Sequence, residues 1–172
     1  NLRAQAAAYG LHPQRRLIFT DRHPQPVHVQ IKSLCDLYLD SPHHNAHATA
    51  VDVLWAGVPM LTQPMETLPS RVATSLSRAA GMEDATTALS VKQYEDLAVR
   101  LASDPDGELA AIRKTLEGGR ASTPAFNMAT FIRNYEAALF SMWDVYSAGE
   151  DVLHHSVEDR SQRSQCSYNM CM

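Results

Sequence analysis

Histidines gather in two short segments of this chain, and imidazoles at such density can ligate a metal or contact a phosphate. Five of the eight histidines stand in or beside residues 21–26 and 41–47, namely His23, His28, His43, His44 and His47. His43 and His47 are at i and i+4, which suits a metal only on a helix, and Pro42 marks this segment as a loop. No Cys or carboxylate completes a ligand set, so no metal site is predicted. His43 and His44 are therefore interpreted as solvated loop residues.

Phosphate binding is the second possibility, at the start of a helix predicted over residues 48–56. The first N–H groups of a helix have no internal partner and its dipole end is positive. His47 and Thr49 could add donors to a phosphate bound there, or Asn45 or Thr49 could merely cap the helix. Asp52, about one turn further on, either complements the helix dipole or accepts hydrogen bonds from ribose hydroxyls.

The elements that must position these residues follow from alternating apolar and helical patterns, which predict a parallel α/β sheet with flanking helices. The expected strands are 16–20, 36–40 and 58–62, and the expected helices include 1–9, 26–34, 48–56, 105–117 and 127–147. Ligands bind outside the carboxyl ends of such strands, so loops 21–26, 41–47 and 63–68 should build the site.

Local signals mark two further helices in the second half of the chain. Pro69 begins one helix and Gly81 ends it. The capping box Ser90-x-x-Gln93 precedes another, whose apolar stripe ends at Leu101. The helix over 127–147 carries its own stripe of large apolar residues, Phe131, Tyr135, Leu139, Met142, Trp143 and Tyr146. That stripe is interpreted as core or as an interface between lobes.

Composition limits the classes of protein. The chain has 172 residues, 45% hydrophobic and 20% charged, which fits one globular domain over 1–149 and excludes a collagen-like or coiled-coil protein. Residues 150–172 are polar and aperiodic, which predicts a disordered tail. No apolar run is long enough to cross a membrane, and a net charge of −4 argues against nucleic acid as a partner. Because the chain starts at Asn1, we expect a fragment.

Motifs for dinucleotides, P-loop phosphates, serine hydrolases and zincins are all missing. Three cysteines, Cys35, Cys166 and Cys171, make no disulfide framework, which favours the cytosol or nucleus. Cys35 opens an apolar run and is interpreted as a buried thiol.

Residues 39–73 resemble the donor-binding signature of the protein O-GlcNAc transferases. The matching motifs are Leu-Asp-Ser-Pro from Leu39, Asp-Val-Leu-Trp-Ala-Gly-x-Pro-Met from Asp52, and Glu-Thr-Leu-x-Ser-Arg-Val from Glu66. The resemblance covers residues 1–148. It implies the C-terminal part of the UDP-binding lobe of a two-lobed, B-type inverting glycosyltransferase. Such enzymes move N-acetylglucosamine from UDP-GlcNAc to Ser or Thr hydroxyls of nuclear and cytosolic proteins, without a metal or other cofactor, and carry tetratricopeptide (TPR) repeats ahead of the catalytic region.

The resemblance also implies a role for each matching position. His28 would stack on uracil, His23 would contact the base through its backbone, and Asp52 would bind the ribose hydroxyls. The diphosphate would be held by His47, Ala48 and Thr49. Gln25 stands where a lysine is usual and Ile31 where an arginine is usual, which should weaken nucleotide binding.

No catalytic residue is assigned in this chain, because the family's catalytic histidine lies in the first lobe. A lysine that contacts the diphosphate lies upstream as well, so the chain alone is expected to be inactive. The sibling protein O-fucosyltransferases carry Cys-Glu-Ser-Leu at this helix, whereas residues 52–55 here favour the GlcNAc branch. Gln25 and Ile31 keep open a third interpretation, a non-catalytic pseudoenzyme or interaction module of the same fold.

Overall fold

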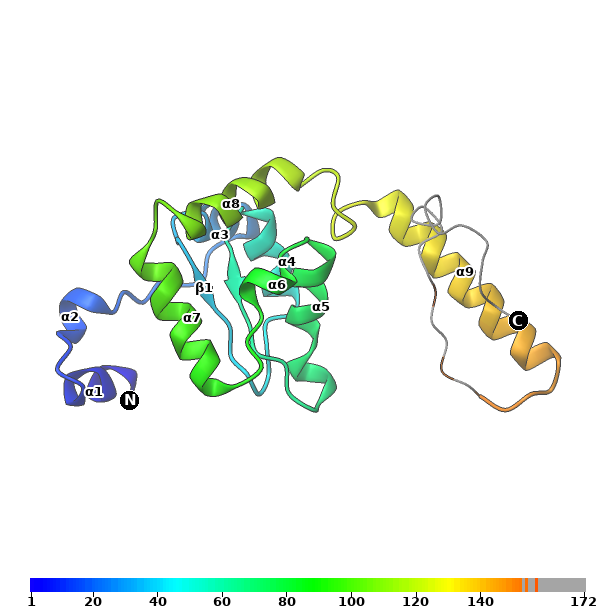
Figure 1. Cartoon of the computed structure of the whole chain (residues 1–172), viewed down its shortest axis with the longest axis horizontal. Helices are drawn as coiled ribbons and strands as arrows, with labels where there is room; N and C mark the ends of the chain where they lie inside the picture. The colour runs from blue at the N-terminus through cyan, green and yellow to red at the C-terminus, as the bar shows by residue number, and fades with distance from the viewer. Residues whose placement is uncertain (153, 155–156, 158–172) are drawn as a thin grey trace.

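The computed structural model describes residues 1–152, 154 and 157, in which short helices surround a small parallel sheet (Figure 1). In chain order the elements are α1 (Leu2–Ala8), α2 (Pro13–Arg16), α3 (Gln25–Lys32), β1 (Tyr38–Leu39), α4 (Ala48–Trp55), β2 (Met60–Leu61), the 3-10 helix η1 (Leu68–Ser70), α5 (Val72–Ala79), α6 (Glu83–Thr86), α7 (Val91–Ser103), α8 (Glu108–Gly119) and α9 (Met128–Ser147). β1 and β2 run parallel, with Tyr38 opposite Met60, and a bridge from Thr62 to Thr87 extends the sheet.

The two residues of β2 face opposite sides of the sheet, because successive strand side chains alternate. Met60 packs into the larger cluster, which includes Leu54 of α4 and Leu116 of α8. Leu61 packs into a smaller cluster with Leu97 of α7. Helices therefore cover both faces, as the α/β prediction requires.

Local end signals mark the ends of α4 and α5 as the sequence predicts, although the helix expected from Pro69 is divided into η1 and α5. Gly57 and Gly81 adopt the left-handed backbone conformation just beyond α4 and α5, with φ of 81° and 77°. Ser90 caps α7 by accepting a hydrogen bond from the Gln93 N–H, and the Gln93 side chain accepts one from the Leu89 N–H. The predicted capping box is therefore confirmed, with its second bond one residue earlier than the usual pattern.

The strand predicted over 16–20 is wrong. Arg16 closes α2, the residues from Leu17 to Thr20 form no regular element, and Ile18 is 88% exposed. A strand needs a neighbour for its N–H and C=O groups, and among the described residues none lies beside this segment. The interpretation of Cys35 as a buried thiol is also wrong, because its residue is exposed after the end of α3.

α9 extends away from the body on the far side from α1 and α2 (Figure 1). Its apolar stripe is exposed, with Phe131 59% and Trp143 63% accessible, so the stripe is not core in this chain. The predicted tail over 150–172 lies mostly outside the described residues. No described helix is both long and apolar enough to span a membrane.

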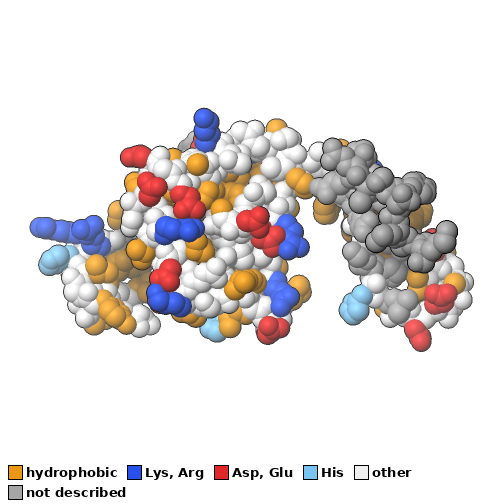
Figure 2. Space-filling view, viewed as in Figure 1, with side chains coloured by type: hydrophobic (Ala, Val, Ile, Leu, Met, Phe, Trp, Pro, Cys, Tyr) orange, Lys and Arg blue, Asp and Glu red, His pale blue; other side chains and the backbone are white. Residues whose placement is uncertain are grey.

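Acidic and basic side chains are interspersed over the face of the body in Figure 2, without a large patch of one sign. Several form ion pairs within or between neighbouring helices, such as Arg78 with Glu83, Lys92 with Asp96 and Arg100 with Glu108. These exposed pairs contribute little to stability. The ion pair between Lys32 of α3 and Asp52 of α4 is less exposed to solvent.

Candidate donor-binding site

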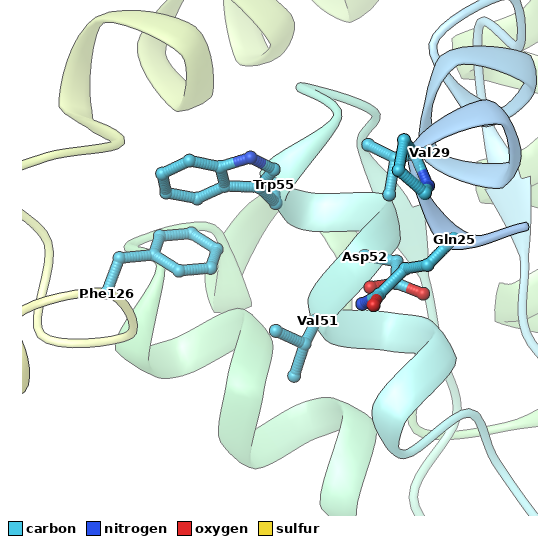
Figure 3. Close-up of a pocket in the computed structure, with 7 residues that line it drawn as sticks. Gln25, Val29, Val51, Asp52, Trp55 and Phe126 are labelled. Atoms are coloured by element: carbon cyan, nitrogen blue, oxygen red, sulfur yellow. The ribbon is translucent and has the colours of Figure 1, made fainter.

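α3 and α4 lie side by side, and a pocket of about 440 Å³ opens between them. The pocket is lined by Gln25, Pro26, Val29, Val51, Asp52, Trp55 and Phe126. Figure 3 shows Trp55 and Phe126 at one end and the polar groups of Gln25 and Asp52 at the other. Its shape and polarity suit a ligand with a flat apolar part and a hydroxyl-bearing part.

Ring contacts fix the apolar end of the pocket. The rings of Trp55 and Phe126 meet edge to face with centroids 5.2 Å apart, and the Arg120 guanidinium lies 5.4 Å from the Trp55 ring centroid. Trp55 remains 47% exposed, so it packs against Phe126 and also forms part of the pocket wall.

Asp52 stands in the second turn of α4, and the first turn contains no acidic residue. Its partner is Lys32, whose Nζ lies 3.4 Å from Asp52 Oδ2 and 3.4 Å from the carbonyl oxygen of Thr49. A helix-dipole role for Asp52 is therefore a poor account, because the dipole effect falls off within the first turn. The sequence analysis missed Lys32, although it follows Gln25 by seven residues and so shares a face of α3.

The start of α4 is open. His47 is the N-cap residue, no side chain caps the helix, and Ala48 and Thr49 are exposed. The alternative in which Asn45 or Thr49 caps this helix is wrong: Asn45 is buried and its side-chain atoms have no protein partner. The first N–H groups of α4 thus remain available to a ligand.

Two of the three expected loops meet at this helix start. The Asn45 N–H donates to the Pro69 carbonyl at 2.9 Å, and His47 Nε2 lies 3.2 Å from the same oxygen. The His47 ring also stacks on His44, with centroids 5.0 Å apart. His43 and His44 are exposed, as predicted, and no described cluster of His, Cys, Asp or Glu could hold a metal.

Asp40, at the end of β1, anchors the loop that delivers His47. Its Oδ1 accepts from the Ala46 N–H at 2.7 Å and its Oδ2 from the Thr62 hydroxyl at 2.8 Å. The Tyr94 hydroxyl donates to the Asp40 carbonyl at 2.7 Å. Burial raises the pKa of the Asp40 carboxyl, against the lowering effect of these hydrogen bonds and of His47. Sequence analysis missed this role, for which the position of Asp40 at a strand end was the available signal.

Comparison with known proteins now adds to this geometry. Residues 1–135 match the model of glycosyl transferase family 41. The chain belongs to this family.

The relatives within the family agree with the resemblance seen in the sequence. The chain is 39% identical over 155 residues to an Arabidopsis thaliana protein named as a probable UDP-N-acetylglucosamine–peptide N-acetylglucosaminyltransferase, SEC, covering 90% of this chain and 16% of that protein. It is 36% identical over 154 residues to the Caenorhabditis elegans UDP-N-acetylglucosamine–peptide N-acetylglucosaminyltransferase, covering 90% and 13%. The chain therefore spans about a seventh of the length of these curated relatives.

A solved structure supports the fold. A mutant O-GlcNAc transferase of Thermobaculum terrenum matches with a TM-score of 0.77 and 26% identity, over 86% of this chain and 28% of that one. The expected fold, a parallel sheet with flanking helices as in this type of glycosyltransferase, is confirmed. The chain is therefore similar in sequence and in fold to part of proteins named as O-GlcNAc transferases.

The resemblance seen in the sequence implies donor-site positions for seven residues, and the structure groups most of them around α3 and α4. Gln25 and Asp52 line the pocket. The residues assigned to the diphosphate, His47, Ala48 and Thr49, form the open start of α4. His28 is half-buried on α3 without lining the pocket, and His23 is exposed in the segment before α3. The residues with expected ribose and diphosphate roles thus lie at or on α4, whereas His28 and His23 lie on or before α3.

Proposed function

We propose that this chain supplies the UDP-binding part of an inverting O-GlcNAc transferase that uses UDP-GlcNAc to modify Ser or Thr hydroxyls of proteins. The observation that carries the proposal is the placement of Asp52 and the open start of α4 on one helix. Consecutive turns are about 5.4 Å apart, so one nucleoside diphosphate can reach both. Ribose hydroxyls would donate to Asp52, and the diphosphate would accept from the first N–H groups of α4.

The chemistry supported by this arrangement is stabilisation of the leaving group. When the sugar–phosphate bond breaks, UDP departs with additional negative charge on its terminal phosphate. The positive end of α4, the Thr49 hydroxyl and the His47 imidazole would stabilise that charge without a metal. The acceptor hydroxyl and its base would come from outside this chain, so the 172 residues alone should transfer no sugar.

The remaining roles of the family pattern are part of the same proposal. His28 would stack on uracil and His23 would contact the base through its backbone. The exposed stripe of α9 would be covered by the rest of the longer protein, including its first lobe. Protein acceptors in the cytosol and nucleus, and TPR repeats ahead of the catalytic region, follow from the same resemblance.

The test compares UDP with inorganic pyrophosphate by calorimetry on the chain and its variants. Asp52→Ala should weaken UDP binding about tenfold or more, because each lost charge-assisted hydrogen bond is worth about 1.5–3 kcal/mol. It should leave pyrophosphate affinity equal or higher, since a negative charge is removed and Lys32 is released. Thr49→Val should weaken both ligands, and the exposed Asp84→Ala on α6 should change neither.

Two results would contradict this assignment. If Asp52→Ala lowers thermal stability but leaves UDP affinity intact, Asp52 does not bind the ribose. If the parent chain shows no UDP binding at all, the non-catalytic interpretation gains support. That interpretation rests on Gln25, an uncharged amide in the pocket wall where the family pattern has a lysine.

A further inference from the structure

Lys32 places a shielded positive charge directly behind the polar end of the pocket. Its side chain is 12% exposed and that of Asp52 is 23% exposed. Asp52 lines the pocket and Lys32 does not, so the carboxylate stands between the ammonium group and the pocket. Asp52 therefore faces a cavity, while the hydrogen bonds of Lys32 Nζ within the described residues go to Asp52 and to the Thr49 carbonyl.

The contacts of the pair divide the two oxygens of Asp52. Lys32 Nζ approaches Oδ2, and within the described residues the hydrogen bonding of this carboxylate is confined to that oxygen. The second contact of Nζ, to the Thr49 carbonyl, fixes the ammonium group against the first turn of α4. With Oδ2 occupied, Oδ1 retains its lone pairs for a donor in the pocket.

A carboxylate close to a bound diphosphate also creates an electrostatic problem. Asp52 is one turn from the helix start where the phosphates would lie, and like charges at that separation repel. The neighbouring ammonium group of Lys32 offsets this repulsion, because it places a positive charge beside the carboxylate.

We infer that Lys32 is a positioning residue of the donor site, which orients and neutralises Asp52 so that its Oδ1 accepts hydrogen bonds from the sugar hydroxyls of a nucleoside diphosphate. The inference rests on the proposed function and adds to it a residue outside the family pattern. It also assigns a compensating charge to a site that lacks cations at Gln25 and Ile31. A purely structural clip between α3 and α4 would contribute to stability alone.

A double-mutant cycle in UDP affinity separates these roles. Lys32→Met keeps the aliphatic stem and should raise the Kd for UDP about five- to tenfold, the scale of one ordinary hydrogen bond. Lys32→Arg should stay within about twofold, because it preserves the charge. In an Asp52→Asn background, Lys32→Met should have no further effect beyond about twofold, since no carboxylate remains to orient. Lys114→Met, which removes an exposed positive charge from α8, is the matched control.

Each outcome has one meaning. The inference is overturned if Lys32→Met leaves UDP affinity unchanged in the parent chain. It is also overturned if Lys32→Met weakens UDP binding equally in the parent chain and in the Asp52→Asn background, because Lys32 would then act on the ligand independently of Asp52. If Asp52→Asn itself leaves UDP affinity unchanged, the proposed ribose contact fails instead. Thermal unfolding establishes that each variant is folded, and Lys32→Gln replaces Lys32→Met if the latter does not fold, with the same expected loss.

Discussion

Asp40→Ala should destabilise the protein by more than any change in the binding residues themselves. The substitution leaves the Ala46 N–H and the Thr62 hydroxyl without their acceptor, and both contacts are short, at 2.7 and 2.8 Å. An unsatisfied buried donor costs about 1–3 kcal/mol. The Thr62 hydroxyl can rotate and the loop can admit water, so we expect a net loss of about 2–4 kcal/mol. UDP affinity should fall as well, because Ala46 precedes His47.

Urea denaturation at pH 7 measures this loss, with the exposed Asp36→Ala as a control expected to stay within about 0.5 kcal/mol. Asp40→Asn adds a test by pH. Burial raises the pKa of Asp40 above its usual 3.8, so the folded state holds the proton more tightly than the unfolded state. The resulting stability is fully present below that value and is lost as the pH rises through the raised pKa. The stability of the parent chain relative to the Asp40→Asn variant should therefore fall as the pH rises through this window. For the anchoring role, the refuting result is a loss of less than about 1 kcal/mol in the Asp40→Ala variant at pH 7.

Two further substitutions test the contacts that hold this framework. Tyr94→Phe should cost about 0.5–1.5 kcal/mol of stability, because it removes the hydrogen bond to the Asp40 carbonyl. Burial raises the pKa of Tyr94 from 10.0 to about 12, so the parent chain should lose stability as the pH rises through this range. The Tyr94→Phe variant should show a smaller loss over the same range in urea denaturation. Arg113→Ala removes guanidinium bonds of 2.8 and 2.9 Å to the carbonyls of Ser33 and Cys35, which join α8 to the end of α3. We expect Arg113→Ala to lower the free energy of unfolding by about 1–3 kcal/mol. Arg113→Lys should have a stability between those of the parent chain and the Ala variant in the same assay, because one ammonium group cannot reach both carbonyls. Equal stability of the Arg113→Lys variant and the parent chain would contradict this role.

The features that sequence predicted well depend on local chemistry. At the start of α9, the Asn127 side chain accepts a hydrogen bond from the Thr130 N–H. Just beyond the end of α4, Gly57 adopts a positive φ. A cap or a left-handed glycine acts within one turn, so a single sequence contains the whole signal. The prediction that Thr49 and Asp52 share one helix is confirmed for the same reason, since both lie on α4.

The errors concern features that depend on distant neighbours. The segment of Ile18 and Phe19 has the composition of a strand, but pairing requires another strand, which composition does not supply. Cys35 resembles a buried thiol by its apolar sequence neighbours, yet it follows the last turn of α3 and faces solvent. Asn45 has the side chain of an N-cap and lies buried instead, because its N–H is bonded to Pro69.

The charge of the donor site is the clearest case in which spatial position outweighs sequence position. A comparison by position counts two missing cations, at Gln25 and Ile31, and predicts weakened nucleotide binding. Residues 31 and 32 of a helix differ by about 100° in direction, and it is Lys32 whose ammonium group reaches α4. The positive charge is therefore present beside Asp52, although it cannot replace a lysine side chain in the pocket wall, where Gln25 offers only neutral hydrogen bonds. Charge beside Asp52 and charge in the pocket wall are thus separate properties, and in this chain Lys32 supplies the first while Gln25 leaves the second neutral.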